Sequence, residues 1–186
     1  MALYIVLGVA VLVALWLVML YNRLVKLRNF VREGWSGIDI QLKKRANLIP
    51  NLVETVKGYM THERETLENV IAMRNAAVSE DSPAERGRKE GMLASALGNI
   101  FALAENYPDL KANTTFLDLQ RNLSEIEDQI QLARRYYNGT VRNLNNAVET
   151  FPSNLVAGMF GFSTAEYFRI EDGAERAVPK VDMGLS

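Results

Sequence analysis

Residues 2–20 read ALYIVLGVAVLVALWLVML, a run without any charged side chain. About 20 residues of helix, each rising about 1.5 Å, cross a hydrocarbon core that is about 30 Å thick. Aromatic rings stand toward both ends of the run, where amphipathic rings favour the headgroup level of a bilayer; they are Tyr4, Trp16 and Tyr21. The stretch therefore predicts a transmembrane anchor over residues 1–21.

Two other interpretations fit this run less well. A cleaved signal peptide has a positively charged start, a shorter apolar core and small residues at its cleavage site, whereas this chain starts Met-Ala-Leu-Tyr and the run ends in bulky residues. A helix in the core of a small soluble protein usually keeps one polar face toward water, and residues 2–20 have none. We therefore expect an uncleaved signal-anchor.

The segment that follows the anchor is basic. Its first cations are Arg23, Lys26, Arg28 and Arg32. Because cytoplasmic flanks of membrane helices carry an excess of Lys and Arg, this bias predicts an N-terminus outside the cell membrane and a cytoplasmic body. Residues 22–45 hold seven cations against two anions, whereas residues 46–186 hold 14 against 20. The basic collar fits anionic lipid headgroups, and the acidic body would repel nucleic acid, so we expect the lipid bilayer as a partner and no nucleic acid.

Beyond the anchor, apolar residues recur at intervals of three and four, which is the period of a helix with one buried face. Pro50 lacks an N–H and crowds the preceding turn, so we expect a kink or break near Leu48–Pro50. The cluster Ser79-Glu80-Asp81-Ser82-Pro83 supplies caps and a Pro at a first helical position, so it predicts a loop and a new helix start, and Asn113 can cap the longest helix. The sequence therefore predicts an all-α fold, with an N-terminal transmembrane helix followed by an elongated antiparallel helical bundle.

Three regions follow from this pattern: the anchor at 1–21, a cytoplasmic helical bundle at 22–150, and a C-terminal segment with a flexible tail at 151–186. The tail contains Pro179 and shows no sustained periodicity. The apolar stretch FPSNLVAGMFGF at 151–162 is expected to fold back onto the bundle. Contact with the membrane surface is the alternative, which we disfavour because the stretch carries no cation.

The chain has little material for chemistry. It contains no cysteine and a single histidine, His62. His62-Glu63 resembles the start of a metalloprotease helix, but the second His four residues later is absent, and a di-iron bundle needs two Glu-x-x-His pairs. We therefore expect no metal, no cofactor and no enzymatic activity.

The longest helix carries a near-heptad apolar seam of the kind seen in coiled coils. Its expected length of about 54 Å exceeds that of its predicted neighbours, so we expect part of the seam to stay uncovered and to bind copies of the same chain. Polar residues beside the seam either fix the register between helices, which we favour, or form a partner-binding face. The candidate interaction residues are Trp35, Arg45, Asn51, Ile126, Ile130, Arg134 and Val141.

Several motifs of this chain resemble the hallmarks of the bacterial LemA family. They are YNRLV at 21–25, WSGIDIQLKKRANLIPNLV at 35–53, VKGY at 56–59, ENYPDLKAN at 105–113, ARRYYN at 133–138, Phe151-Pro152 and Gly161-Phe162. The resemblance covers nearly the whole chain. It implies a bacterial membrane protein with its N-terminus outside and a cytoplasmic helical body, similar to scaffolds or accessory factors that accompany membrane proteases.

Together these patterns favour a non-enzymatic, membrane-anchored scaffold. We expect it to assemble laterally as a homo-oligomer on the inner face of the cell membrane. The alternative is an adaptor or accessory subunit of another membrane protein, such as a membrane zinc metalloprotease.

Overall fold

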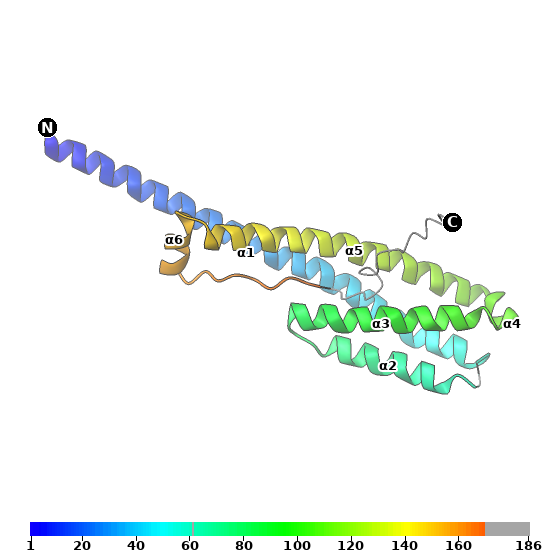
Figure 1. Cartoon of the computed structure of the whole chain (residues 1–186). Helices are drawn as coiled ribbons and strands as arrows, with labels where there is room; N and C mark the ends of the chain where they lie inside the picture. The colour runs from blue at the N-terminus through cyan, green and yellow to red at the C-terminus, as the bar shows by residue number, and fades with distance from the viewer. Residues whose placement is uncertain (61, 170–186) are drawn as a thin grey trace, which may run out of the picture. The chain divides into compact units, whose positions relative to one another are not determined.

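The computed structural model describes residues 1–60 and 62–169, and these residues form helices without any strand. The expected all-α fold, with a long apolar N-terminal helix followed by a helical body, is confirmed. The helices are α1 (Ala2–Lys57), α2 (Arg64–Val78), α3 (Pro83–Ala104), α4 (Pro108–Lys111), α5 (Thr114–Glu149) and α6 (Ser153–Met159) (Figure 1).

The described chain groups into two compact units. Unit 1 combines Met1–Leu48 with Asp118–Phe168, and unit 2 combines Ile49–Leu117 with Arg169. Unit 1 therefore contains the apolar start of α1, most of α5 and α6. Residues 170–186, which include most of the predicted flexible tail, lie outside the described residues.

The sequence predicts a kink or a break near Leu48–Pro50. Helix α1 passes through Pro50 without ending, so the break is wrong. A proline inside a helix costs about 3 kcal/mol. Pro50 itself is exposed, whereas Ile49, Leu52 and Val56 are fully buried in unit 2. Burial of each such side chain contributes about 1.5–3 kcal/mol. The packing of the buried face therefore outweighs the lost hydrogen bond.

In unit 1, α1 and α5 lie antiparallel. Arg45 of α1 contacts Glu127 of α5, and the Trp35 ring contacts the Tyr137 ring. The contact that lies earlier on α1 thus lies later on α5, which shows that the two helices run in opposite directions. The helices approach closely at Gly34, where a Cβ atom would lie 3.1 Å from the Cα of Tyr137. The core between them is apolar and is formed by Leu24, Ile38, Leu42, Leu123, Ile130, Val141 and Leu144.

The chain after α5 folds back onto unit 1, which confirms the favoured expectation for residues 151–162. Val156 and Ala157 of α6 pack in one cluster with Leu24 of α1 and with Phe162. Gly161 turns the chain after α6 with a positive φ of 68°, a conformation that favours glycine. Residues 162–169 then run without helical structure.

Unit 2 contains α2, α3 and α4, together with the ends of α1 and α5 that belong to it. The expected helix start at Ser82 is confirmed, because its hydroxyl accepts from the Glu85 N–H and Pro83 occupies the first turn. The expected cap at Asn113 is also confirmed, since its side-chain oxygen accepts from the Phe116 N–H at 3.0 Å. Leu67, Val70, Leu93, Leu97 and Ile100 form much of the core.

Candidate functional site

Among the described residues, α1 is the one helix that is long and apolar enough to cross a membrane, and its apolar stretch is its N-terminal part. Its side chains before Leu20 are exposed, including the predicted anchoring residues Tyr4 and Trp16. The cations of the collar, Arg23, Lys26, Arg28 and Arg32, are exposed as well. This end of the helix thus has the composition and exposure that a lipid environment requires.

Two collar cations lie over aromatic rings. Lys26 Nζ is 5.6 Å from the centre of the Phe30 ring, and the Arg28 guanidinium is 5.0 Å from that of Phe162. Tyr21 makes edge contacts with Phe160 and Phe162, with ring centres 4.8 and 5.8 Å away. The collar cations and Tyr21 on α1 therefore pack against the aromatic rings of the segment after α6. The sequence did not reveal the part that this segment plays.

Two asparagines of α5 hold residues 165–168 by paired hydrogen bonds. Asn145 accepts from the Ala165 N–H and donates to the Ala165 carbonyl, at 2.8 and 3.0 Å. Asn138 binds the N–H and carbonyl of Phe168 in the same way, both at 3.0 Å. Seven helical residues rise about 10.5 Å, and three extended residues span about 10 Å. The spacing of the asparagines therefore matches the backbone that they hold.

We call the hydrogen bonds of Asn138 and Asn145 to residues 165–168 the clamp. Trp35 lies beside it, in an aromatic cluster. Its ring centre is 5.6 Å from that of Tyr137 and 6.0 Å from that of Phe168, whose side chain is fully buried. The Tyr137 hydroxyl donates to the Glu166 carbonyl at 2.9 Å. Burial and the nearby Glu166 carboxylate raise the pKa of Tyr137 to about 12, so the hydroxyl keeps its proton even in alkaline solution. Trp35 therefore joins α1, α5 and the C-terminal segment.

Arg45 forms the ion pair that joins the middle of α1 to α5. Its Nη1 lies 2.5 Å from Glu127 Oε2, and Gln131 Nε2 donates to the other carboxylate oxygen at 2.9 Å. The Arg45 side chain is 2% exposed, whereas that of Glu127 is 35% exposed. The pair joins α1 to α5, and its part in setting the register of the two helices stays a prediction.

The predicted uncovered seam needs correction. Ile130 and Val141 are fully buried and Ile126 is partly buried. The physical reason is that α1 runs unbroken alongside α5 and covers the seam over its length in unit 1. Of the remaining candidates, Asn51 is exposed in unit 2 and Arg134 is half-buried on α5.

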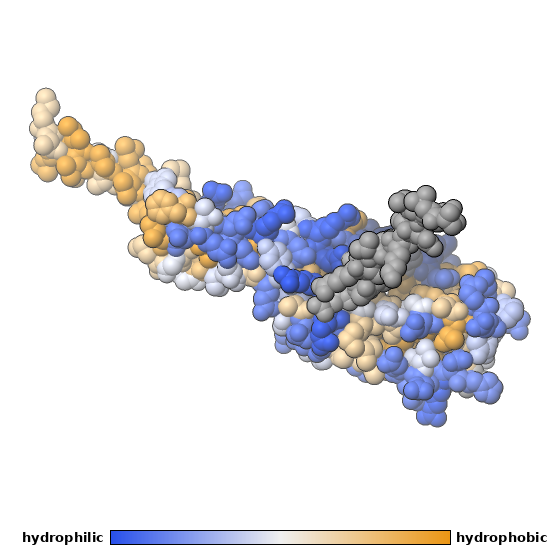
Figure 2. Space-filling view, in the orientation of Figure 1, coloured by the Kyte–Doolittle hydropathy of each residue, from blue (hydrophilic) through white to orange (hydrophobic). Residues whose placement is uncertain are grey.

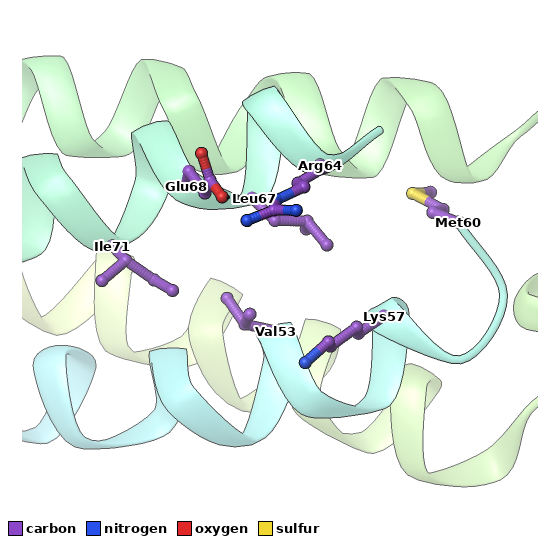
Figure 3. A pocket seen from close by; sticks show the side chains of 7 residues that line it. All are labelled: Val53, Lys57, Met60, Arg64, Leu67, Glu68 and Ile71. Carbon is purple, nitrogen blue, oxygen red and sulfur yellow. Dashed lines mark hydrogen bonds and ion pairs between the residues drawn. The ribbon is translucent and has the colours of Figure 1, made fainter. Parts of the chain in front are cut away.

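Unit 2 has a groove between the end of α1 and α2 (Figure 3). The buried apolar side chains of Met60 and Leu67 line it, together with the exposed Lys57. Arg64 and Glu68 form an exposed ion pair at 2.7 Å along α2. The described lining contains no hydroxyl, imidazole or thiol group, so the groove has the character of a contact surface.

His62 and Glu63 lie at another hollow of unit 2, beside Glu65 and Asn99. Within residues 1–60 and 62–169, no three His, Asp or Glu side chains gather as ligands for a metal ion. The structure therefore gives this histidine no coordination partners in the part of the chain that it describes.

Comparison with known proteins places these features in a family. The sequence profile of the LemA family matches residues 34–183. Protein LemA of Metamycoplasma hominis is 28% identical over 169 residues, which cover 89% of this chain and 74% of that protein. Magnetosome protein MamQ 2 of Paramagnetospirillum magneticum is 26% identical over 179 residues, covering 82% of this chain and 66% of its own length. Magnetosome protein MamQ of Magnetospirillum gryphiswaldense is 24% identical, with 82% and 65% covered.

The matched region begins at Gly34, where α1 and α5 approach closely, and includes both asparagines of the clamp. The profile thus covers the body of the chain, while the apolar start of α1 precedes it. With four fifths of the sequence matched by the profile, the chain belongs to the LemA family.

Proposed function

We propose that this protein is a non-enzymatic scaffold that is anchored in the cell membrane and assembles laterally with copies of itself on the inner face. One observation carries the proposal: α1 continues without a loop from its apolar start into the packed pair with α5. Because no hinge intervenes, unit 1 is held at a set height above the bilayer. A protein that presents a rigid helical surface at a set height is suited to organise neighbours.

Anchorage favours self-association because it confines all copies to one plane, where weak lateral contacts gain from a high effective concentration. Leu132 and Tyr136 are each 50% exposed on α5. They lie four residues apart and therefore share one face of the helix. We place the lateral contact on this face, in place of the buried seam residues Ile130 and Val141.

The assembly is tested by the mass of the full chain after extraction in a mild detergent. The wild type is expected to give particles larger than a monomer. Replacing Leu132 and Tyr136 together by Asp should reduce them to monomers without loss of helical circular dichroism, because two carboxylates repel across a lateral contact. The control introduces the same two charges at Gln120 and Ser124, which are also exposed on α5 and four residues apart, but lie on a different face of the helix.

Wild-type monomers at every concentration would exclude self-assembly. A stable complex with a different membrane protein, for example a protease, would instead support the adaptor role. Particles of unchanged size in the Leu132→Asp, Tyr136→Asp variant would place the contact elsewhere on the molecule.

The orientation is tested with a reporter fused after Ser186, which we expect to lie in the cytoplasm. Reversing the charges of Arg23, Lys26, Arg28 and Arg32 should move a fraction of the reporters to the outside, because these cations flank the apolar segment. The matched control reverses Lys43 and Lys44, which lie beyond the range over which flanking charges act. An external reporter in the unaltered protein contradicts the proposed topology.

A further inference from the structure

We infer that α6 and the residues beside it form a second membrane contact, inserted at a shallow depth into the leaflet from which α1 emerges. The contact consists of Phe151, Leu155, Met159 and Phe160, and we call it the α6 patch. The inference rests on the proposed membrane anchorage. It adds a lipid-binding surface to the body of the protein, which lies outside the candidate span.

The α6 patch is apolar and exposed. Its four side chains are between 58% and 75% exposed. Leu155 and Met159 are four residues apart on α6 and therefore share one face of the helix. Phe151 precedes α6 and Phe160 follows it, so the patch extends beyond both ends of the helix. The opposite side of α6 is occupied, because Val156 and Ala157 are buried against unit 1.

The position of the patch is set by its contact with the end of the apolar segment. The Phe160 ring lies 4.8 Å from that of Tyr21, the aromatic residue that follows residues 2–20. Tyrosine in this position favours the headgroup level of a bilayer. Phe160 is thus brought to the same level by direct contact. Figure 2 shows the apolar surface of α1 continuing onto apolar surface at the adjoining end of the body.

The charges around the patch also favour lipid as its occupant. Residues 150–162 contain no charged side chain, so desolvating them costs no buried charge. Cations stand beside the patch on α1, where Arg28 lies over the Phe162 ring. An apolar face with neighbouring Lys and Arg is the composition of segments that lie in the membrane interface. The collar thus supplies the cations that the α6 stretch itself lacks.

A second contact changes what the anchor can do. A single helix leaves the body free to rotate about the membrane normal and to tilt. With the α6 patch also in the headgroup region, one side of unit 1 must face the bilayer, and the exposed face of α5 takes a defined direction. This restriction favours a uniform lateral contact between copies.

The experiment uses the full chain in vesicles of phosphatidylcholine and phosphatidylglycerol. Because the protein has no cysteine, single Cys substitutions can carry an environment-sensitive fluorophore at chosen positions. The test positions are Leu155 and Met159, the exposed control is Ser124 on α5, and the control for insertion is Leu12 within the apolar segment. Quenching by spin-labelled lipid and by aqueous iodide is measured for each.

We expect labels at 155 and 159 to be quenched by shallow spin-labelled lipid roughly threefold more than the label at 124, and by iodide correspondingly less. Adding Met159→Asp should return the label at 155 toward the behaviour of the control. If the Leu12 label is not quenched by lipid, the anchorage itself is wrong. If Leu12 is quenched but 155 and 159 match position 124, the α6 patch is not a membrane contact. Labels shielded from both quenchers until the protein is diluted in lipid would assign the patch to a second copy and overturn the inference.

Discussion

Replacing Ile130 by Asp is expected to lower the free energy of unfolding by at least about 4 kcal/mol, a large part of the roughly 5–15 kcal/mol that stabilises a typical domain. Ile130 is 0% exposed between α5 and α1. The substitution removes about 1.5–3 kcal/mol of apolar burial, and the carboxylate adds a desolvation penalty of several kcal/mol or forces the helices apart. Urea unfolding of the full chain in detergent micelles, followed by circular dichroism, measures the loss.

The matched control is Ser124→Asp, on the same helix and outside the proposed lateral contact. Ser124 is exposed, so its carboxylate remains hydrated, and we expect a change within about 0.5 kcal/mol. The two variants carry the same new charge, and only burial separates them. Equal, small losses would mean that the seam at Ile130 is not core, and the predicted uncovered seam would then regain support.

The seam and Pro50 were misjudged for separate reasons. The predicted uncovered stripe treats the longest helix as packed only by shorter neighbours, but α1 lies along it in unit 1 before Leu48, and Ile130 and Val141 are buried. At Pro50, local propensity disfavours a helix, and the burial of Ile49 and Leu52 outweighs that preference, so α1 continues. This packing is not visible in the sequence.

Features that depend on neighbouring residues alone were predicted well. The caps at Ser82 and Asn113 form as expected, because a cap is satisfied within three residues of itself. The helical period of the body was equally readable, since burial of one face follows from spacing. The exposed apolar run at the start of α1 also has the length and composition that the sequence predicts.

The clamp on residues 165–168 was not predicted, since its two halves are separated in the chain and neither is distinctive by itself. Asn138 and Asn145 look like surface residues of a helix, and residues 162–169 have no period that assigns a structure. One usable signal is the interval of seven residues, which places both asparagines on one face. Phe168 gives another, because an aromatic residue in a segment without a helical period needs somewhere to pack.

The pair of Arg45 and Glu127 leads to the second large effect. Removing one partner of a buried ion pair destabilises the fold most when the remaining partner is the more buried one, because water cannot reach that charge to compensate it. Arg45 is 2% exposed and Glu127 is 35% exposed. The two single substitutions should therefore differ strongly, although each removes the same contact.

We expect Glu127→Leu to lower the free energy of unfolding by about 3 kcal/mol. Arg45→Met should cost less than about 1 kcal/mol, because Met fills much of the same volume and the remaining carboxylate still reaches water and the Gln131 amide. The double variant should lie near Arg45→Met, since an apolar pair replaces both charges. Urea unfolding of all four proteins gives the coupling energy directly. If Glu127→Leu costs no more than Arg45→Met, the buried guanidinium is satisfied without Glu127, and the ion pair does not set the register of the two helices.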